Sequence, residues 1–288
     1  MTARRLALGL AALLALGAGA ALALRAADAR AEGALRAALL KAGRDAPAPA
    51  FHPAMLDGLP APARRFFRFA IAPGTPLRIA ATIEMGGTLS LGPRDDARDQ
   101  PMTARQILAP PHGFLWQVET GGAMRLTGSD ALGAGTSSTR FRLLSALPVV
   151  RVAGDPNHFR SAFGRMVGEG LFWTPAAFLP QAQSGWDALA WEAVDGDTAR
   201  VVVAKYGLEQ AAEITVDPEG RLLRVVFRRW SNENAARRYR LQPFGGDVSG
   251  FARFDGFGLP TRVTGGNHYG TELYHPFFKA KATRITLR

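Results

Sequence analysis

Short segments in which apolar and polar residues alternate recur along most of this chain. Examples are 77–85, 139–143, 199–206 and 221–230, and turns such as 195–197 separate successive segments. Alternation with a period of two is typical of strands that have one buried face. Parallel neighbours need a crossover of a dozen or more residues, so strands this close along the chain must pair antiparallel. The sequence therefore predicts a meandering antiparallel sheet of about ten strands.

One long stretch departs from this alternation. From Phe159 to Pro180 the apolar residues recur at the spacing of a helical face. Asp155 is suited to cap the first free N–H groups, and the proline that follows it fits the first helical turn. Pro175 cannot continue a helix. We expect one main helix over Asp155–Trp173, packed on the sheet, in an α+β fold.

The N-terminal segment is basic at its start and then apolar. Leu6–Leu24 holds 19 residues without a charge, between the roughly 7–15 of a signal-peptide core and the roughly 20 of a spanning helix. The small residues at 27 and 29 have the form of a cleavage site. We expect an uncleaved hydrophobic helix that anchors the protein, with a cleaved signal peptide as the alternative.

The orientation of this segment is a separate question. Arg4 and Arg5 favour a cytoplasmic N-terminus, whereas the basic residues between 25 and 44 favour the opposite arrangement. The position at the extreme N-terminus favours export. We expect a cell-envelope protein, anchored in the inner membrane with its domain facing the periplasm, or secreted to the periplasm after cleavage.

The chain divides into three parts by composition. Residues 1–30 form the signal or anchor segment, 31–58 an alanine-rich helical stalk with a proline-rich linker, and 59–288 a single β-rich domain. With 47% hydrophobic residues over its whole length, the chain can bury a substantial core.

Several classes of chemistry lack a sequence signature. The chain has no cysteine, which excludes disulfides, thiolate metal sites and a cysteine nucleophile. Hydrolase, phosphate-binding, dinucleotide-binding and zinc-protease motifs are absent, and the five histidines do not lie at ligand spacing. We expect no metal and no cofactor. The net charge of +11 has no nucleic-acid-binding motif beside it, so we expect no nucleic acid as a partner.

One group of polar residues on the expected helix is a candidate site. At 100° per residue, His158, Arg165, Glu169 and Trp173 form a strip along one edge of the apolar face. Glu169 can then be a half-buried carboxylate beside a ligand cavity, with Arg165 acting on its pKa. Alternatively, Glu169 pairs with Arg165 and only stabilises the helix.

The most basic part of the chain lies at 221–240. Within it Leu223, Val225 and Phe227 are expected to share the buried face of a strand, while Arg224 and Arg228 share the other face. A solvated outer face explains these arginines, and a surface for phospholipid headgroups is the alternative.

Four segments together resemble a bacterial domain-of-unknown-function family. They are LPAPARRFFR from Leu59, Glu169-x-x-x-Trp173-Thr174-Pro175-x-x-x-Leu179-Pro180, DPEGRL from Asp217 and GLPTRV from Gly258. Pro175-Ala176-Ala177-Phe178 stands where the family more often has P-T-A-L, and Gly170 replaces its usual alanine, which are mild departures. The resemblance spans most of 59–288 and implies an architecture without an activity. The layout is also similar to periplasmic lipoprotein carriers, which implies a curved, half-barrel-like sheet around an apolar concavity.

These observations favour one function over two others. We expect a non-catalytic envelope module that binds an apolar or amphiphilic, lipid-like ligand, with the membrane as a partner of the N-terminal segment. One alternative is an enzyme that uses Glu169 as an acid or base. The other is a scaffold whose arginine-rich surface binds proteins or anionic membrane.

Overall fold

A single antiparallel sheet dominates the protein. The computed structural model describes residues 2–122 and 125–288, and this part of the chain forms thirteen strands in one open sheet. The strands are β1 (Ala81–Leu91), β2 (Arg98–Ala109), β3 (Gly113–Thr120), β4 (Leu126–Gly133), β5 (Thr136–Leu143), β6 (Leu147–Ala153), β7 (Ala188–Ala193), β8 (Thr198–Lys205), β9 (Leu208–Val216), β10 (Leu222–Ser231), β11 (Arg240–Phe254), β12 (Phe257–Asn267) and β13 (His275–Leu287).

The helices differ greatly in length. The α-helices are α1 (Thr2–Asp45), α2 (Ala61–Ala70) and α3 (Pro156–Trp173), and the short 3₁₀ helices are η1 (Pro53–Leu56), η2 (Arg94–Asp96), η3 (Pro175–Phe178) and η4 (Pro180–Ala182). The α+β class with one packed helix and a long N-terminal helix is confirmed.

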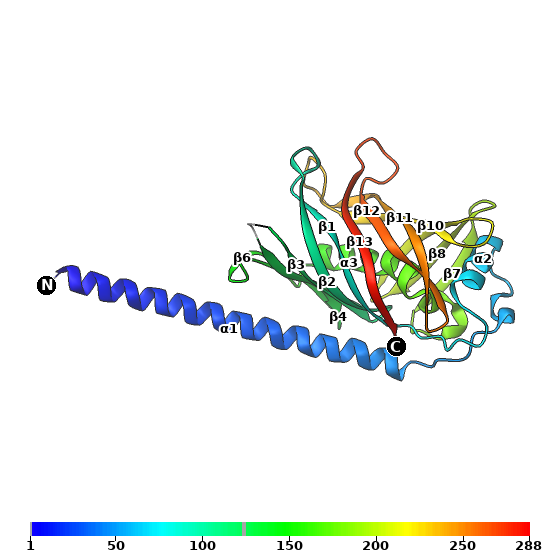
Figure 1. Cartoon of the computed structure of the whole chain (residues 1–288), viewed down its shortest axis with the longest axis horizontal. Helices are drawn as coiled ribbons and strands as arrows, with labels where there is room; N and C mark the ends of the chain where they lie inside the picture. Colours follow the sequence, from blue (N-terminus) through cyan, green and yellow to red (C-terminus); the bar gives the residue numbers. More distant parts are fainter. Residues whose placement is uncertain (1, 123–124) are drawn as a thin grey trace. The chain divides into compact units, whose positions relative to one another are not determined.

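The strand order explains why α3 lies inside the sheet. The order is β6-β5-β4-β3-β2-β1-β13-β12-β11-β10-β9-β8-β7, so two meanders meet where β1 pairs with β13. β6 and β7 follow one another in the chain but lie at opposite edges of the sheet. The segment between them, which contains α3, must cross from one edge to the other. Figure 1 shows α3 within the curve of the sheet, where it contacts β10 and β9 as well as β5 and β4.

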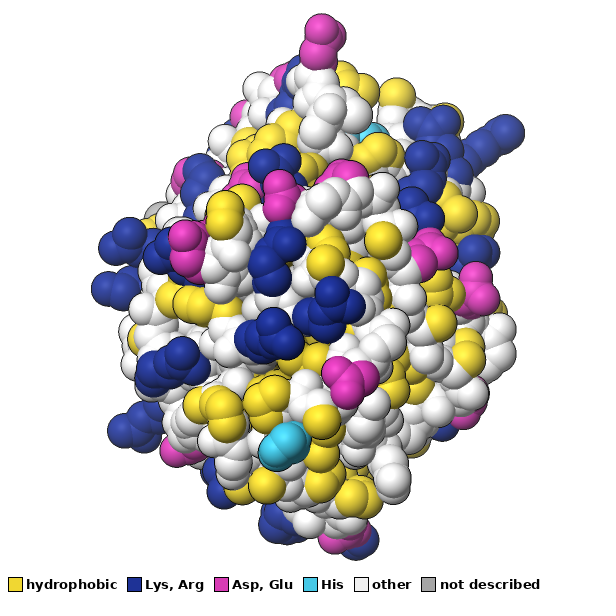
Figure 2. Space-filling model, turned by 90° about the vertical axis from the view of Figure 1, so that its right-hand side faces the viewer, with side chains coloured by type: hydrophobic (Ala, Val, Ile, Leu, Met, Phe, Trp, Pro, Cys, Tyr) yellow, Lys and Arg dark blue, Asp and Glu magenta, His cyan; other side chains and the backbone are white. Residues whose placement is uncertain are grey.

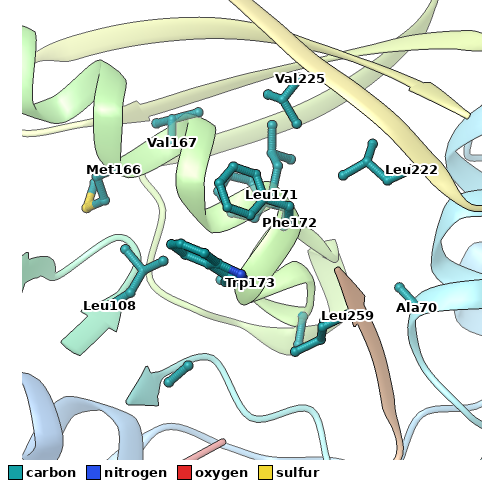
Figure 3. Packing of buried hydrophobic residues seen from close by; sticks show 14 of the residues in the cluster. Ala70, Leu108, Met166, Val167, Leu171, Phe172, Trp173, Leu222, Val225 and Leu259 are labelled. Carbon is teal, nitrogen blue, oxygen red and sulfur yellow. The ribbon is translucent and has the colours of Figure 1, made fainter. Parts of the chain in front are cut away.

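Local chemistry sets where α3 begins and which residues it buries. The Asp155 carboxylate accepts a hydrogen bond from the backbone N–H of His158 at 2.9 Å, as expected for a cap. Toward its C-terminal end α3 is buried on most sides, because the sheet curves around it. Figure 3 shows part of the buried cluster, to which α3 contributes Met166, Val167, Leu171, Phe172 and Trp173.

Three strands, β2, β4 and β6, were not expected from the alternation of side chains. β2 begins with exposed residues and ends with the buried run Ile107–Ala109. β6 is exposed at all but one position, and β4 is rich in small and polar residues. Backbone hydrogen bonds to neighbouring strands hold these segments in the sheet, and backbone pairing requires no particular side-chain pattern.

A bulge corrects the expected face of one residue in β10. Leu223 was expected to be buried with Val225, but its side chain is 39% exposed and Leu222 is buried instead. The pairing of β10 with β9 shifts between Leu222 and Arg224. An extra residue at a bulge reverses the alternation on its N-terminal side.

The chain separates into two compact units, Met1–Ala38 and Leu39–Arg288. In the second unit, Phe51 and Leu56 are buried although they precede the expected start of the domain at Leu59. The Phe51 N–H donates to Thr75 O at 2.8 Å, which ties this segment to the core.

Among the described residues, one helix is long and apolar enough to cross a membrane. It covers Leu8–Asp45 within α1. Its role as an anchor stays a prediction.

Candidate functional site

A cavity of about 260 Å³ lies between α3 and the inner face of the sheet. Its lining is mostly aromatic, aliphatic or glycine: Leu89, Trp116, Phe141, Gly168, Phe172, Val225, Phe227, Phe244, Gly245, Gly246, Val263, Gly265, Phe277 and Phe278. The charged lining residues are Asp130, Arg165, Glu169 and Arg229. The volume is slightly below the roughly 300–1,000 Å³ of typical small-molecule sites, so the space suits a slender ligand or one end of a longer one.

Sheet register builds the floor of this cavity. Leu89 pairs with Phe278, Phe278 with Gly265, Gly265 with Gly246, and Gly246 with Val225, across β1, β13, β12, β11 and β10. Residues paired directly across strands point to the same face of a sheet. The two glycines stand at the centre of this row. A Cβ atom at Gly246 would lie 2.6 Å from Thr264 O, whereas one at Gly265 would meet nothing closer than 3.4 Å.

Arg165 joins two carboxylates at the polar part of the wall. Its Nε donates to Glu169 Oε1 and its Nη1 to Asp130 Oδ2, each at 2.7 Å. The guanidinium also lies 4.9 Å from the ring centroid of Phe114 and 5.0 Å from that of Trp116. Burial alone would lower the pKa of Arg165, but the Glu169 and Asp130 charges outweigh burial and raise it. Arg165 is therefore a permanent cation in this site.

The hydrogen bonds continue on both sides of this pair of carboxylates. Gln106 Nε2 donates to Glu169 Oε2 at 2.5 Å. On the other side, the Thr139 hydroxyl donates to Asp130 and lies 2.8 Å from His158 Nε2. Since the hydroxyl hydrogen of Thr139 points to Asp130, His158 Nε2 must be the donor to Thr139.

The other ring nitrogen of His158 completes the network. His158 Nδ1 lies 2.7 Å from Ser137 Oγ, so Nδ1 accepts from the serine when Nε2 carries the hydrogen. Burial lowers the pKa of His158, against the opposing effect of Asp130, and favours this neutral ring. The hydrogen bonds of His158 hold α3 against β5, and the bond from Arg165 to Asp130 holds it against β4.

The structure brings three of the four expected site residues together. His158, Arg165 and Glu169 belong to one hydrogen-bond network, and the last two line the cavity. Trp173 lies elsewhere: its side chain is buried in the core, and its Nε1 lies 3.4 Å from Pro260 O.

Sequence reasoning did not single out Asp130 or Arg229. Asp130 follows a glycine and a serine in a strand that the alternation does not reveal. Arg229 has the same parity as Val225 and Phe227, and this parity is the signal that could have placed it inside.

The described residues hold no group of three or more metal-ligating side chains close enough to bind a metal ion. On the face seen in Figure 2, basic side chains are interspersed with acidic and hydrophobic ones.

The family model described as "Family of unknown function (DUF6544)" matches residues 49–280. The chain belongs to the DUF6544 family. The resemblance expected from the sequence is thereby confirmed, and the matched region contains every residue that lines the cavity. A comparison with curated proteins gave no match.

Two solved structures are similar to this DUF6544 protein in fold. One is a LolA superfamily protein from Nitrosomonas europaea, with 11% identity and a TM-score of 0.41 over 79% of this chain and 92% of that chain. The other is a putative outer membrane lipoprotein-sorting protein domain from Vibrio parahaemolyticus, with 10% identity and a TM-score of 0.38 over 73% of this chain and 85% of that chain.

Proposed function

We propose that the β-rich unit is a non-catalytic binding module for an apolar or amphiphilic, lipid-like ligand held in the cavity beside α3. The observation that carries the proposal is the lining of the cavity, where aromatic and aliphatic side chains surround a space with charges at one part of its wall. Burial of apolar surface supplies roughly 25 cal/mol per Å², so such a lining favours an apolar ligand over water.

The polar residues support binding more than catalysis. Both oxygens of Glu169 accept hydrogen bonds, from Arg165 and Gln106. These two hydrogen bonds hold the carboxylate in one orientation toward protein groups, which favours a structural role for Glu169. An enzyme that uses Glu169 as an acid or base is the less favoured function.

We also propose that the N-terminal helix holds this module at the inner membrane, with the module facing the periplasm. Support comes from the apolar span within α1 and from the basic residues that precede it. A ligand of lipid character would then be taken up where lipid is abundant.

A substitution that fills the cavity tests the binding function. A Cβ atom at Gly265 would meet nothing closer than Gly245 O at 3.4 Å, an ordinary contact. Gly265→Leu should therefore place its side chain in the cavity without moving the strands. Thr264→Leu is the matched control, because the neighbouring residue of the same strand points to the opposite face.

The readout is binding of N-phenyl-1-naphthylamine, an uncharged apolar dye. The wild type and Thr264→Leu should bind the dye equally. Gly265→Leu should lose most of the saturable dye binding, and its melting temperature should be no lower than that of the wild type. Lipid extraction and mass spectrometry should find similar amounts of copurified lipid in the wild type and Thr264→Leu, and less in Gly265→Leu. Equal dye binding by folded Gly265→Leu would refute the proposed cavity.

A further inference from the structure

Arg229 is the cavity residue whose charge the fold leaves least compensated. It lies on β10 on the same face as Val225 and Phe227, which line the cavity with it. Its Nε donates to the hydroxyl and the carbonyl oxygen of Ser161 at 3.1 and 3.3 Å. Its Cζ lies 4.8 Å from the ring centroid of Phe244. Helix α3 and an aromatic ring therefore fix the position of the guanidinium.

The terminal amino groups of Arg229 have no such partner. Within 2–122 and 125–288, neither Nη atom forms a hydrogen bond, and no carboxylate lies within ion-pair distance of Arg229. The nearby carboxylates are already engaged: Glu169 by Arg165 and Gln106, and Asp130 by Arg165 and Thr139. The two Nη atoms of this cavity-lining cation thus have no acceptor in the described part of the chain.

The electrostatic surroundings agree with this geometry. Burial, together with the charge of Arg165, lowers the pKa of Arg229 to about 10, although Asp130 and Glu169 act in the opposite direction. Arg229 is still a cation at neutral pH, but one that its surroundings stabilise less than water would. An anion in contact with it would restore the lost stabilisation, and the planar guanidinium suits carboxylate and phosphate oxygens.

We propose that Arg229 binds the anionic head of an amphiphile, a carboxylate or a phosphate, whose apolar tail occupies the rest of the cavity. This inference rests on the proposed binding function and narrows its ligand class. The remaining lining suits the tail, because it is apolar. Phe227 and Val225 follow Arg229 along the same face of β10, and Phe244 pairs with Phe227 on the neighbouring strand.

Competition for N-phenyl-1-naphthylamine tests this inference on the full-length protein, with the signal of Gly265→Leu subtracted as background. The competitors are decanoate, decyl phosphate and 1-decanol, which share one tail and differ in their heads. On the wild type we expect at least one anion to compete roughly tenfold or more better than the alcohol, since hydrogen bonds to charged groups contribute that much. The better of decanoate and decyl phosphate identifies the head group.

Variants of the arginine then locate the effect. Arg229→Met should bind the dye but lose the preference for anions, and Arg229→Lys should keep part of it. Arg228→Met is the matched control, because Arg228 is exposed on the other face of β10 and should retain the full preference.

The outcomes separate this inference from the function on which it rests. If the wild type binds the dye but the anions and the alcohol displace it equally well, Arg229 does not bind an anionic head. The cavity would then be a site for neutral ligands. An unchanged anion preference in Arg229→Met also overturns it. A wild type that binds no dye above the Gly265→Leu background overturns both proposals.

Discussion

A Cβ atom at Gly168 would lie 2.5 Å from Cε1 of Phe227, so α3 passes β10 at a distance that only glycine permits. Both residues line the cavity, and their contact is part of the boundary between core and cavity. The glycine lowers the helix propensity of α3 by roughly 1 kcal/mol relative to alanine. Close packing against Phe227 compensates for that loss.

Gly168→Ala should therefore destabilise the protein despite the better helix former. Overpacking of a core costs roughly 1–3 kcal/mol, which exceeds the roughly 1 kcal/mol gained in propensity. Urea denaturation measures the net change, expected to be on the order of 1 kcal/mol. Gly196→Ala, where a Cβ would meet nothing within 4 Å, is the control and should stay close to the wild type. A Gly168→Ala protein more stable than the wild type would contradict the packing.

Phe163→Ala should cost roughly 3–5 kcal/mol of unfolding free energy. The Phe163 side chain is 1% exposed and lies among the core residues of α3, so its removal leaves a hole. Leu223→Ala provides the comparison, because the bulge in β10 exposes Leu223 and its loss should change stability by less than about 0.5 kcal/mol. Similar losses in the two variants would mean that the bulge or the helix face is misplaced.

Glu169→Gln should destabilise the fold because Arg165 loses one of its two carboxylates. The side chains of Arg165 and Glu169 are 14% and 16% exposed, so solvent replaces little of the lost interaction, and we expect a loss of roughly 1–3 kcal/mol. Lys41 and Asp45 form an ion pair of the same spacing with both side chains mostly exposed. Asp45→Asn should therefore cost less than about 1 kcal/mol. Thermal melting of the two variants makes the comparison, and an unchanged Glu169→Gln melt would contradict the structural role of this ion pair.

Unfolding free energy should decrease as the pH falls through about 6.5. Burial lowers the pKa of His158 below its ordinary value of 6.5, so in this range the unfolded chain takes up a proton that the folded protein does not. His112, whose pKa burial also lowers, contributes with the same sign. Urea titrations between about pH 7.5 and pH 5.5 measure how the unfolding free energy changes with pH. This change should be smaller in His158→Gln than in the wild type, and smaller still in the double variant with His112→Gln. An unchanged dependence in the double variant would refute this assignment.

Alkaline phosphatase fused after Ala50 should be active, because we place the residues after the apolar segment outside the cytoplasm. The reason is the uncharged run that follows Arg4 and Arg5. A cytoplasmic reporter such as β-galactosidase at the same position is the complementary control and should be inactive. The reverse pattern would invert the orientation of the segment.

The sequence by itself determined the elements whose causes are local. The alternation along β8 and β10, the Asp155 cap and the helical face of α3 depend on residues a few positions apart, so their chemistry is readable in the chain. The pairing of Arg165 with Glu169 also follows from spacing of four along a helix.

Only the tertiary structure decided what surrounds the cavity. Leu89 and Phe278 share a row of the sheet because the first strand pairs with the last, and no local pattern encodes that register. The same holds for Arg229. Its position in the alternation of β10 assigns it to one face of the sheet, but not to the residues that pack against that face. Asp130 reaches Arg165 only because the two meanders curve around α3. Interactions between residues so distant in the chain depend on how the whole sheet closes around the helix, so the cavity and its unpaired cation emerge only once the fold is complete.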